Sequence, residues 1–238
     1  MFEIINEAFS KGLITSAVSK MPGAPGTAVF IAGIVLTALI GYLLGSLNFA
    51  LILSKKMYGD DIRTHGSKNA GTTNMMRTYG NKAAAFTIIG DMLKAVLSVV
   101  IGCFLMGIFH GGYAAALGCM IGHIFPLYYN FKGGKGVATA AAAILVLNPM
   151  AFLCVIAVFL ICVICTRYIS LGSVLAAAVF PLITFYSYFG GPSAAPGSGF
   201  AFICAFIMAI AVILKHHANL SRLAHGTESK FSFKKSKK

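Results

Sequence analysis

Charge is scarce in this sequence. Only 11% of its 238 residues are Asp, Glu, Lys or Arg, 58% are hydrophobic, and the mean hydropathy is +0.85. An ordinary soluble domain carries about 25% charged residues, so this chain has too little polar surface to coat a globule. The composition excludes a disordered chain, a nucleic-acid-binding domain and a disulfide scaffold. It predicts an all-α, polytopic integral membrane protein.

Several functional signals are also missing. A signal peptide is not expected, because Glu3 and Glu7 stand where its basic region would be. The pair Cys162 and Cys165 has no second pair and no His at zinc spacing, so we expect no metal and no cofactor. All six cysteines fall in apolar runs and are predicted to be buried free thiols: Cys103, Cys119, Cys154, Cys162, Cys165 and Cys204.

Apolar runs of the length that a bilayer span needs, about 20 residues, occur in five places: 28–54, 84–109, 111–129, 169–188 and 199–215. The stretch 134–166 is ambiguous. It is either one long helix or two short helices hinged at Asn148-Pro149, because proline kinks or ends a helix. The first short helix, 134–148, would be only about 22 Å long, so it would have to pack against its neighbours or sit in a thinned bilayer.

The basic residues decide between these two counts. With two helices in 134–166, every Lys and Arg outside the apolar runs lies on one side of the membrane, except Lys11 and Lys20. The positive-inside rule then favours seven transmembrane helices, with the N-terminus outside and the C-terminus cytoplasmic. We expect an N-terminal interfacial extension at 1–27, with apolar positions at Phe2, Ile5, Phe9, Leu13 and Val18. A seven-helix domain would occupy 28–217, and a basic cytoplasmic tail 218–238.

Two loops on the predicted cytoplasmic side carry residues suited to phosphate. The first combines glycines, amides, hydroxyls and cations between Asp60 and Arg77. Alone, it is equally compatible with a solvated polar loop. In the second, Gly133-Gly134-Lys135-Gly136 leads into a helix N-terminus, where free N–H groups and the helix dipole attract anions. Two such loops on one face favour a phosphate-bearing ligand.

Two further features belong to the same face or lie next to it. His216 either caps the last span, or it carries a proton or donates a hydrogen bond to phosphate. Asp91 and Lys94 lie inside an apolar run, three residues apart on one helix face. Charges within a membrane are costly and point to function. We expect this pair to form a structural ion pair that orients the adjacent site.

These motifs together resemble the bacterial acyl-phosphate-dependent glycerol-3-phosphate acyltransferases, the PlsY family. The similarity runs in order from about residue 30 to 230. It is carried by Gly45-Ser46, Asp61–Arg63, Gly66–Arg77, Asp91–Lys94, Gly122–Pro126, Phe131–Thr139, Ser170–Ser173, His216–Leu223 and Gly226–Glu228. The sequence departs from the family pattern at Asn48, Ala70 and Thr73, and both ends are longer than usual.

The resemblance implies transfer of a fatty acyl group from acyl-phosphate to the 1-hydroxyl of glycerol 3-phosphate. It also implies a multi-pass protein of the bacterial inner membrane that acts as a monomer among membrane lipids, with its site facing the cytoplasm. The implied catalytic residues are Ser67, Arg77, Lys135, His216 and Asn219. The implied substrate-binding residues are Arg63, Gly66, Asn69, Gly71, Asn74, Gly133, Gly134, Gly136, Ser170, Ser173 and Glu228. Asp91, Lys94 and His123 would support them.

Within this set, roles are hypotheses. One phosphate would be held by Ser67, Asn69, Asn74 and Arg77. The Gly133–Gly136 turn would hold the acyl-phosphate or the transferring centre, and Ser170, His216 and Asn219 would orient glycerol 3-phosphate. The general base is either His216 or a substrate phosphate.

Other functions fit the sequence less well. The sequence lacks the His-x4-Asp pair of the other large class of glycerolipid acyltransferases, because Ala70, Tyr128 and Ser221 stand five residues after His65, His123 and His216. The main alternative is a membrane transporter or channel for an organic phosphate. A transporter needs access from both sides and often shows inverted repeats, whereas here the polar motifs all lie on one face. A purely structural scaffold would leave these loops unexplained.

Overall fold

The computed structural model describes residues 11–21, 23–189 and 197–231, and these ranges are entirely helical apart from their connecting loops. The helices are α2 (Leu13–Val18), α3 (Ala24–Gly45), α4 (Phe49–Tyr58), α5 (Thr72–Tyr79), α6 (Asn81–Met106), α7 (Tyr113–Ile124), α8 (Val137–Leu147), α9 (Pro149–Thr166), α10 (Ile169–Phe189), α11 (Ser198–Lys215) and α12 (His217–Ala224). Short helical turns occupy Ile62–Thr64, Gly107–Gly112 and Leu127–Tyr129.

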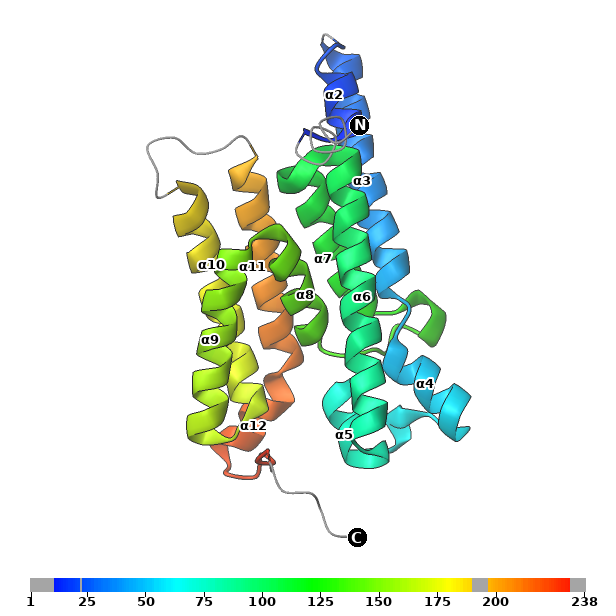
Figure 1. The fold of residues 1–238 in the computed structure, drawn as a ribbon, viewed down its shortest axis with the longest axis vertical. Helices are drawn as coiled ribbons and strands as arrows, with labels where there is room; N and C mark the ends of the chain where they lie inside the picture. The colour runs from blue at the N-terminus through cyan, green and yellow to red at the C-terminus, as the bar shows by residue number, and fades with distance from the viewer. Residues whose placement is uncertain (1–10, 22, 190–196, 232–238) are drawn as a thin grey trace.

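The helices form two groups with α8 between them (Figure 1). On one side α3, α6 and α7 pack together, and on the other side α9, α10 and α11 do so. The helix α8 lies against α6, α7 and α9, while α11 also contacts α7 and so joins the two groups. The main buried apolar cluster spans α6, α7, α8, α9, α10 and α11, so the core lies where the two groups meet.

The outer surface of the bundle is apolar. Five stretches are long and apolar enough to cross a membrane: Ala24–Tyr58, Asn81–Tyr129, Pro149–Thr166, Ile169–Ser187 and Ser198–Lys215. Large apolar side chains such as Val35, Leu93 and Ile164 are more than half exposed on α3, α6 and α9. A soluble protein of this size rarely exposes such continuous apolar surface, whereas lipid tails solvate it.

The stretch Asn81–Tyr129 contains two helices that double back on each other. The chain reverses at Gly107–Gly112, and Gly107 has a positive φ of 73° that ends α6. The two helix ends approach so closely that a Cβ on Gly102 would lie 2.3 Å from the carbonyl oxygen of Gly111. The runs expected at 84–109 and 111–129 are therefore separate helices, as predicted.

The predicted break within 134–166 is confirmed. The helix α8 ends at Leu147 and α9 begins at Pro149. Between them, the Asn148 side chain caps α9 by accepting a hydrogen bond from the Ala151 backbone N–H at 2.9 Å. At 11 residues, α8 is short, and it packs inside the bundle as expected.

The run expected at 28–54 is interrupted. The helix α3 ends at Gly45, and α4 begins at Phe49 and points away from the bundle axis (Figure 1). Asn48 caps α4 through the Leu51 backbone N–H at 3.1 Å. The Lys94 ammonium donates to the carbonyl oxygens of Gly45 and Leu47 at 2.9 and 2.7 Å. A buried cation therefore satisfies the carbonyls that a continuous helix would have used.

At the N-terminal end, the expected apolar positions Phe2, Ile5 and Phe9 lie outside the described residues. The next segment, α2, packs against α3 and α6, and the Thr15 hydroxyl donates to the Met106 carbonyl at 3.2 Å. Among the cysteines, all six are free, but Cys154 and Cys165 are exposed on α9, so the expectation that every thiol is buried is wrong for these two.

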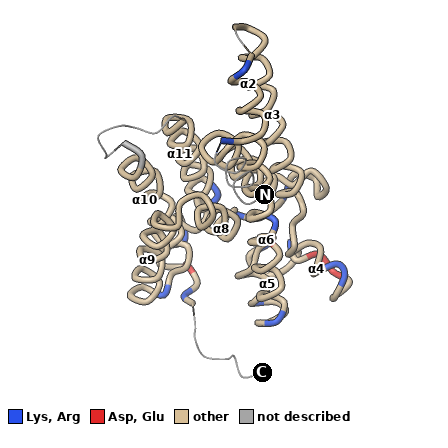
Figure 2. The backbone as a smooth tube through the Cα atoms, turned by 45° about the horizontal axis from the view of Figure 1, so that its top comes forward, with Lys and Arg blue, Asp and Glu red and all other residues tan. Residues whose placement is uncertain are grey.

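Basic residues gather at one end of the molecule. Figure 2 shows Lys and Arg concentrated around α4, α5 and the α9 end near α12, while α2 lies at the opposite end with Lys11 and Lys20 beside it. Of the predicted basic tail, α12 and the residues up to 231 are described, and 232–238 lie outside the described part.

Candidate active site

A cavity of about 850 Å³ opens at the basic end and extends into the bundle between α6, α8, α9, α10 and α11. Its residues near the basic end are mostly polar, and those deeper in the bundle are apolar. Of the expected site residues, its wall contains Gly66, Ser67, Asn69, Gly71, Asn74, Arg77, Asp91, His123, Lys135, Gly136, Ser170, Ser173, His216, Asn219 and Glu228. The fold thus brings together residues from five separate stretches of the sequence: 66–77, 91, 123–136, 170–173 and 216–228.

The polar end is built around Glu228. Its Oε1 accepts hydrogen bonds from the Ser170 hydroxyl at 2.7 Å and from the Asn219 amide at 2.6 Å, and its Oε2 accepts from Arg222 Nε at 2.7 Å. Asn219 Oδ1 in turn accepts a hydrogen bond from the Lys135 ammonium. One carboxylate therefore connects α10, α12 and the loop before α8.

The charges in this cluster are tuned by burial and by each other. Burial lowers the pKa of Lys135 from its usual value of 10.5 to about 8, although the Glu228 carboxylate opposes this effect. For Glu228, burial raises the pKa, but the hydrogen bonds from Asn219, Ser170 and Arg222 outweigh it and the pKa is lowered. Near neutral pH Lys135 is therefore a cation poised to receive an anion, and Glu228 is ionised.

His216 has an unprotonated ring nitrogen and lies in the cavity wall. Its Nδ1 lies 2.8 Å from the Val212 carbonyl oxygen, which can only accept, so Nδ1 carries the proton and Nε2 is left as an acceptor. Burial, together with the charge of Lys135, lowers the pKa of His216 to about 4. At neutral pH His216 is an uncharged imidazole.

The first polar loop is organised by Asn74. Its Oδ1 accepts from the Ser67 backbone N–H at 3.0 Å, and its Nδ2 donates to the carbonyls of Ile62, His65 and Asn69 at 3.0–3.1 Å. The Asn74 side chain is 1% exposed. Although Asn74 was expected to hold phosphate, its amide is committed to the loop backbone, and Ser67, Asn69 and Arg77 remain as the lining side chains of this loop.

The glycine pair of the second loop serves close packing. The backbone N–H groups of Gly133 and Gly134 donate to the carbonyls of Ile124 and His123, both at 3.1 Å. A Cβ on Gly134 would lie 2.2 Å from His123 Nε2, and one on Gly133 would lie 2.0 Å from the His123 carbonyl oxygen. Neither glycine lines the cavity, and their missing Cβ atoms allow the close packing on His123 that precedes Lys135.

Arg63 is likewise outside the cavity. Its guanidinium forms a two-point ion pair with Asp61, with Nη2 2.7 Å from Oδ2. Its Nη1 donates to the carbonyls of Tyr129 and Lys132 at 2.9 and 3.1 Å. This arginine therefore ties the first polar loop to the second rather than binding substrate.

Asp91, Lys94 and His123 form a buried cluster beneath these loops. Lys94 Nζ lies 2.8 Å from Asp91 Oδ1 and 3.1 Å from His123 Nδ1. Lys94 also holds the end of α3, and the His123 ring packs under Gly134. The cluster is a self-neutralising support for the site, as expected for the ion pair. Asp91 and His123 contribute to the cavity wall.

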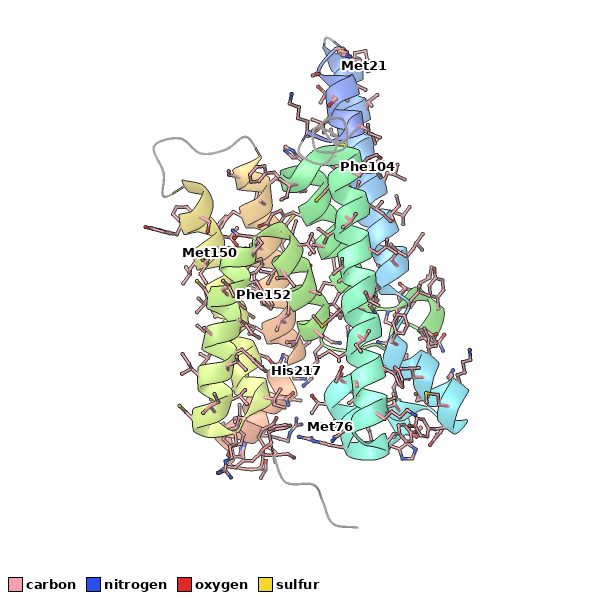
Figure 3. All side chains as sticks on the ribbon, in the orientation of Figure 1. Met21, Met76, Phe104, Met150, Phe152 and His217 are labelled. Carbon is pink, nitrogen blue, oxygen red and sulfur yellow. The ribbon has the colours of Figure 1, made fainter. Side chains whose placement is uncertain are left out.

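The apolar residues that line the deep part of the cavity were not predicted individually from the sequence. Figure 3 labels Phe152 on α9, one of the apolar side chains that line it, and Met76, which lines it from α5 near the basic end. Thr72, Thr73 and Ser229 also line the polar end. No local motif marks the apolar residues, because an apolar side chain that faces a groove and one that faces lipid look alike in sequence. Within the described ranges, no three His, Cys, Asp or Glu side chains are grouped to hold a metal ion.

Comparisons with known proteins cover most of this region. A family profile described as glycerol-3-phosphate acyltransferase matches residues 35–226. A glycerol-3-phosphate acyltransferase of Trichlorobacter lovleyi is 46% identical over 196 residues, which cover 80% of this chain and 93% of that protein. One of Clostridioides difficile is 40% identical over 206 residues, covering 84% of this chain and 97% of that protein.

Two solved structures share the fold. A crystal structure of PlsY (YgiH), an integral membrane glycerol 3-phosphate acyltransferase in its glycerol 3-phosphate form, matches with a TM-score of 0.74 at 30% identity. It covers 84% of this chain and 96% of that chain. The lysophosphatidic acid form of PlsY matches with a TM-score of 0.72 at 29% identity, over 84% of this chain and 95% of that chain.

Proposed function

Because this chain belongs to the glycerol-3-phosphate acyltransferase family, we propose that it transfers a fatty acyl group from an acyl-phosphate to the 1-hydroxyl of sn-glycerol 3-phosphate. The products are lysophosphatidic acid, which is 1-acyl-glycerol 3-phosphate, and inorganic phosphate. The chain is thus an integral membrane acyltransferase for glycerol 3-phosphate. Beyond this family assignment, we propose the identity of the acyl donor and of the hydroxyl that is acylated. We also propose that this reaction is the first acylation in phospholipid synthesis.

One observation carries the proposal: a single cavity joins a cationic, hydrogen-bonding end to an apolar groove within the bundle. The polar end suits phosphoryl groups, because Arg77, Lys135 and Arg222 line it. The groove suits a hydrocarbon chain, whose burial is favourable by about 0.8 kcal/mol per methylene. An acyl-phosphate has both parts, one at each end of the same molecule. The transporter alternative has no comparable support, since the relatives are acyltransferases.

The reaction mainly requires that the two substrates be positioned and that the negative charge of the transition state be stabilised. The 1-hydroxyl oxygen attacks the acyl carbonyl carbon, an ester bond forms, and the bond from that carbon to the phosphate oxygen breaks. Phosphate leaves with the electron pair. Lys135, held by Asn219, is placed to stabilise negative charge on the oxyanion or the departing phosphate. Ser170 and Asn219, both fixed by Glu228, are placed to orient the acceptor.

The hydroxyl proton goes to the stronger available base. The pKa of His216 is about 4, whereas the second pKa of a phosphate monoester is about 6. The departing phosphate is therefore the better acceptor, and His216 Nε2 serves as a neutral hydrogen-bond acceptor in the wall. We therefore favour the substrate phosphate over His216 as the base, of the two that the sequence leaves open.

The membrane arrangement that we propose has seven spans, an outer N-terminus and a cytoplasmic C-terminus in the bacterial inner membrane. It counts α6 and α7 separately and α8 as a short span. The basic residues at the cavity end (Figure 2) support the placement of that end on the cytoplasmic side. We also propose that a monomer among membrane lipids suffices for activity, with no nucleic acid, metal or cofactor.

The test supplies purified protein with glycerol 3-phosphate and one of three donors: acyl-phosphate, acyl-CoA or acylated carrier protein. We expect lysophosphatidic acid from acyl-phosphate alone. Lys135→Met serves as the matched inactive control, because it keeps the side-chain length and removes the charge. Equal turnover of acyl-CoA would overturn the donor assignment, and product acylated at the other hydroxyl would overturn the acceptor position.

A further inference from the structure

The walls of the apolar groove are lined by small side chains just beyond the polar end. On three helices they are Val137, Ala138, Ala140 and Ala141 on α8, Ala176 and Ala177 on α10, and Ala209 and Val212 on α11, while α9 lines the same section with the larger Val155, Ile156 and Phe159. Small residues let three helices approach while leaving a channel between them. This section of the groove therefore has little to stop a chain that passes through it.

The deep end differs in kind. On each of four helices, the lining residue farthest from the polar end is large: Ile144 on α8, Phe152 on α9, Phe180 on α10 and Met208 on α11. Ile144, Phe180 and Met208 are each at most 3% exposed. These four residues, called the end layer here, form the floor of the groove.

Behind the end layer the bundle is solid. Leu147, Ala151, Cys204 and Ala205 are the next inward residues along α8, α9 and α11, and each is at most 3% exposed. All four residues belong to the main buried cluster, and none of them lines the cavity. Protein cores are packed as densely as organic crystals, so an acyl chain cannot pass this point without displacing the end layer.

The depth of the groove is comparable to a fatty acyl chain. At about 1.5 Å per helical residue, the stretch of α10 from Ser170 to Phe180 spans about 15 Å. An extended chain advances about 1.2 Å per single bond, as the three bonds of an extended peptide residue do over about 3.6 Å. The groove thus accepts roughly a dozen carbons past its polar end, so the terminal carbons of a long acyl chain reach the end layer.

We propose that the end layer, with Phe180 as its rigid member, sets the longest acyl chain that the enzyme uses efficiently. Phe180 is the most restrictive of the four because an aromatic ring turns about only two side-chain torsions, whereas Met208 has three and adapts its shape. Phe180 is also 3% exposed and belongs to the main buried cluster. This inference rests on the proposed acyl transfer and adds the residue that selects chain length.

The experiment is a competition. Parent and variant proteins receive glycerol 3-phosphate and an equimolar mixture of saturated acyl-phosphates from decanoyl to octadecanoyl, and the products are separated by mass. Product ratios report relative kcat/KM and do not depend on how much enzyme is active. We expect Phe180→Ala to raise the ratio of octadecanoyl to tetradecanoyl product about tenfold or more. A single methylene that an apolar pocket accepts or rejects commonly changes kcat/KM by at least this factor.

Two further variants keep the test decisive. Phe180→Leu is a milder shortening that serves if the alanine variant does not fold, and it shifts the ratio in the same direction by less. Ala177→Leu narrows the groove from the same helix and shifts the ratio towards shorter chains. The control is Leu182→Ala, which removes a side chain on α10 that is 68% exposed outside the groove and leaves the ratio unchanged.

The outcomes separate this inference from the function it rests on. If the parent forms no product from any acyl-phosphate, the proposed donor is wrong. If the parent is active but Phe180→Leu and Ala177→Leu give the parental distribution, the end layer does not measure the chain.

Discussion

Replacing Lys135 by Met is expected to make the protein more stable and far less active. In the substrate-free protein the Lys135 ammonium is largely buried, and burial lowers its pKa from 10.5 to about 8. At 1.36 kcal/mol per pKa unit, holding the charged form in this site costs on the order of 3 kcal/mol of folding free energy. Met has a similar length and no charge, so it removes that cost.

Part of the gain is offset. Lys135→Met deletes the hydrogen bond to Asn219, and leaving a polar partner unsatisfied costs about 1–3 kcal/mol. A net stabilisation of about 1 kcal/mol remains, which corresponds to a rise in Tm of about 2–4 °C for a chain of this size. For turnover, loss of a donor that stabilises developing charge reduces kcat by about 10²–10³-fold.

The stability difference has a defined pH dependence. Below pH 8 Lys135 is protonated in both the folded and the unfolded chain, and the full penalty applies. Between about pH 8 and 10.5 the folded protein releases the proton while the unfolded chain keeps it, so the parent gains stability as pH rises. The Tm advantage of Lys135→Met is therefore largest at pH 7 and shrinks towards pH 10.

Thermal unfolding in detergent, followed at several pH values, measures this effect alongside product formation. The matched control is Lys132→Met, which makes the same chemical change at an exposed position in the same loop and should alter neither quantity substantially. The reasoning is refuted if Lys135→Met lowers the Tm at pH 7, or if its kcat stays within tenfold of the parent.

Three other substitutions or titrations test separate parts of the site. The His216 imidazole, with a pKa of about 4, should stay neutral from pH 7 to 5.5 in histidine-selective NMR of the substrate-free protein; a midpoint near 6.5 contradicts this. Gly134→Ala should reduce both Tm and turnover, because its Cβ would meet His123 Nε2 at 2.2 Å, whereas Gly199→Ala, with open space around it, should change neither; equal behaviour of the two variants counts against the packing role. Asn74→Ala should destabilise the protein by about 2–4 kcal/mol through its lost buried hydrogen bonds, measured as a fall in Tm, and an unchanged Tm would show that the loop does not depend on it.

The membrane class, the helix break at Asn148 and the gathering of the polar motifs were all predictable from the sequence. Each depends on a local signal: the length of an apolar run, a proline after a capping residue, or the sign of the charge in a loop. The end of α3 at Gly45 was not predictable in this way. It depends on Lys94, which is distant in the sequence and reaches the Gly45 carbonyl only in the folded bundle.

The site was predictable as a set of residues but less so as a set of roles. Four residues are of types that bind phosphate but serve the loop framework instead: Gly133, Gly134, Asn74 and Arg63. Asn74 and Arg63 donate hydrogen bonds to loop carbonyls. The two glycines allow close backbone packing because they lack a Cβ. Residue type and spacing cannot tell a ligand contact from a backbone contact. Lys135, by contrast, combines a charge with a position in the cavity wall, and the structure retains it at the centre of the site.

The central claim is that one cavity holds both substrates and moves the acyl group directly between them. The most direct measurement follows phosphate release and lysophosphatidic acid formation together, in purified protein given acyl-phosphate with and without glycerol 3-phosphate. The account predicts one phosphate released for each ester formed, and little release when glycerol 3-phosphate is left out. Rapid phosphate release without the acceptor, or ester formation without phosphate release, would contradict it.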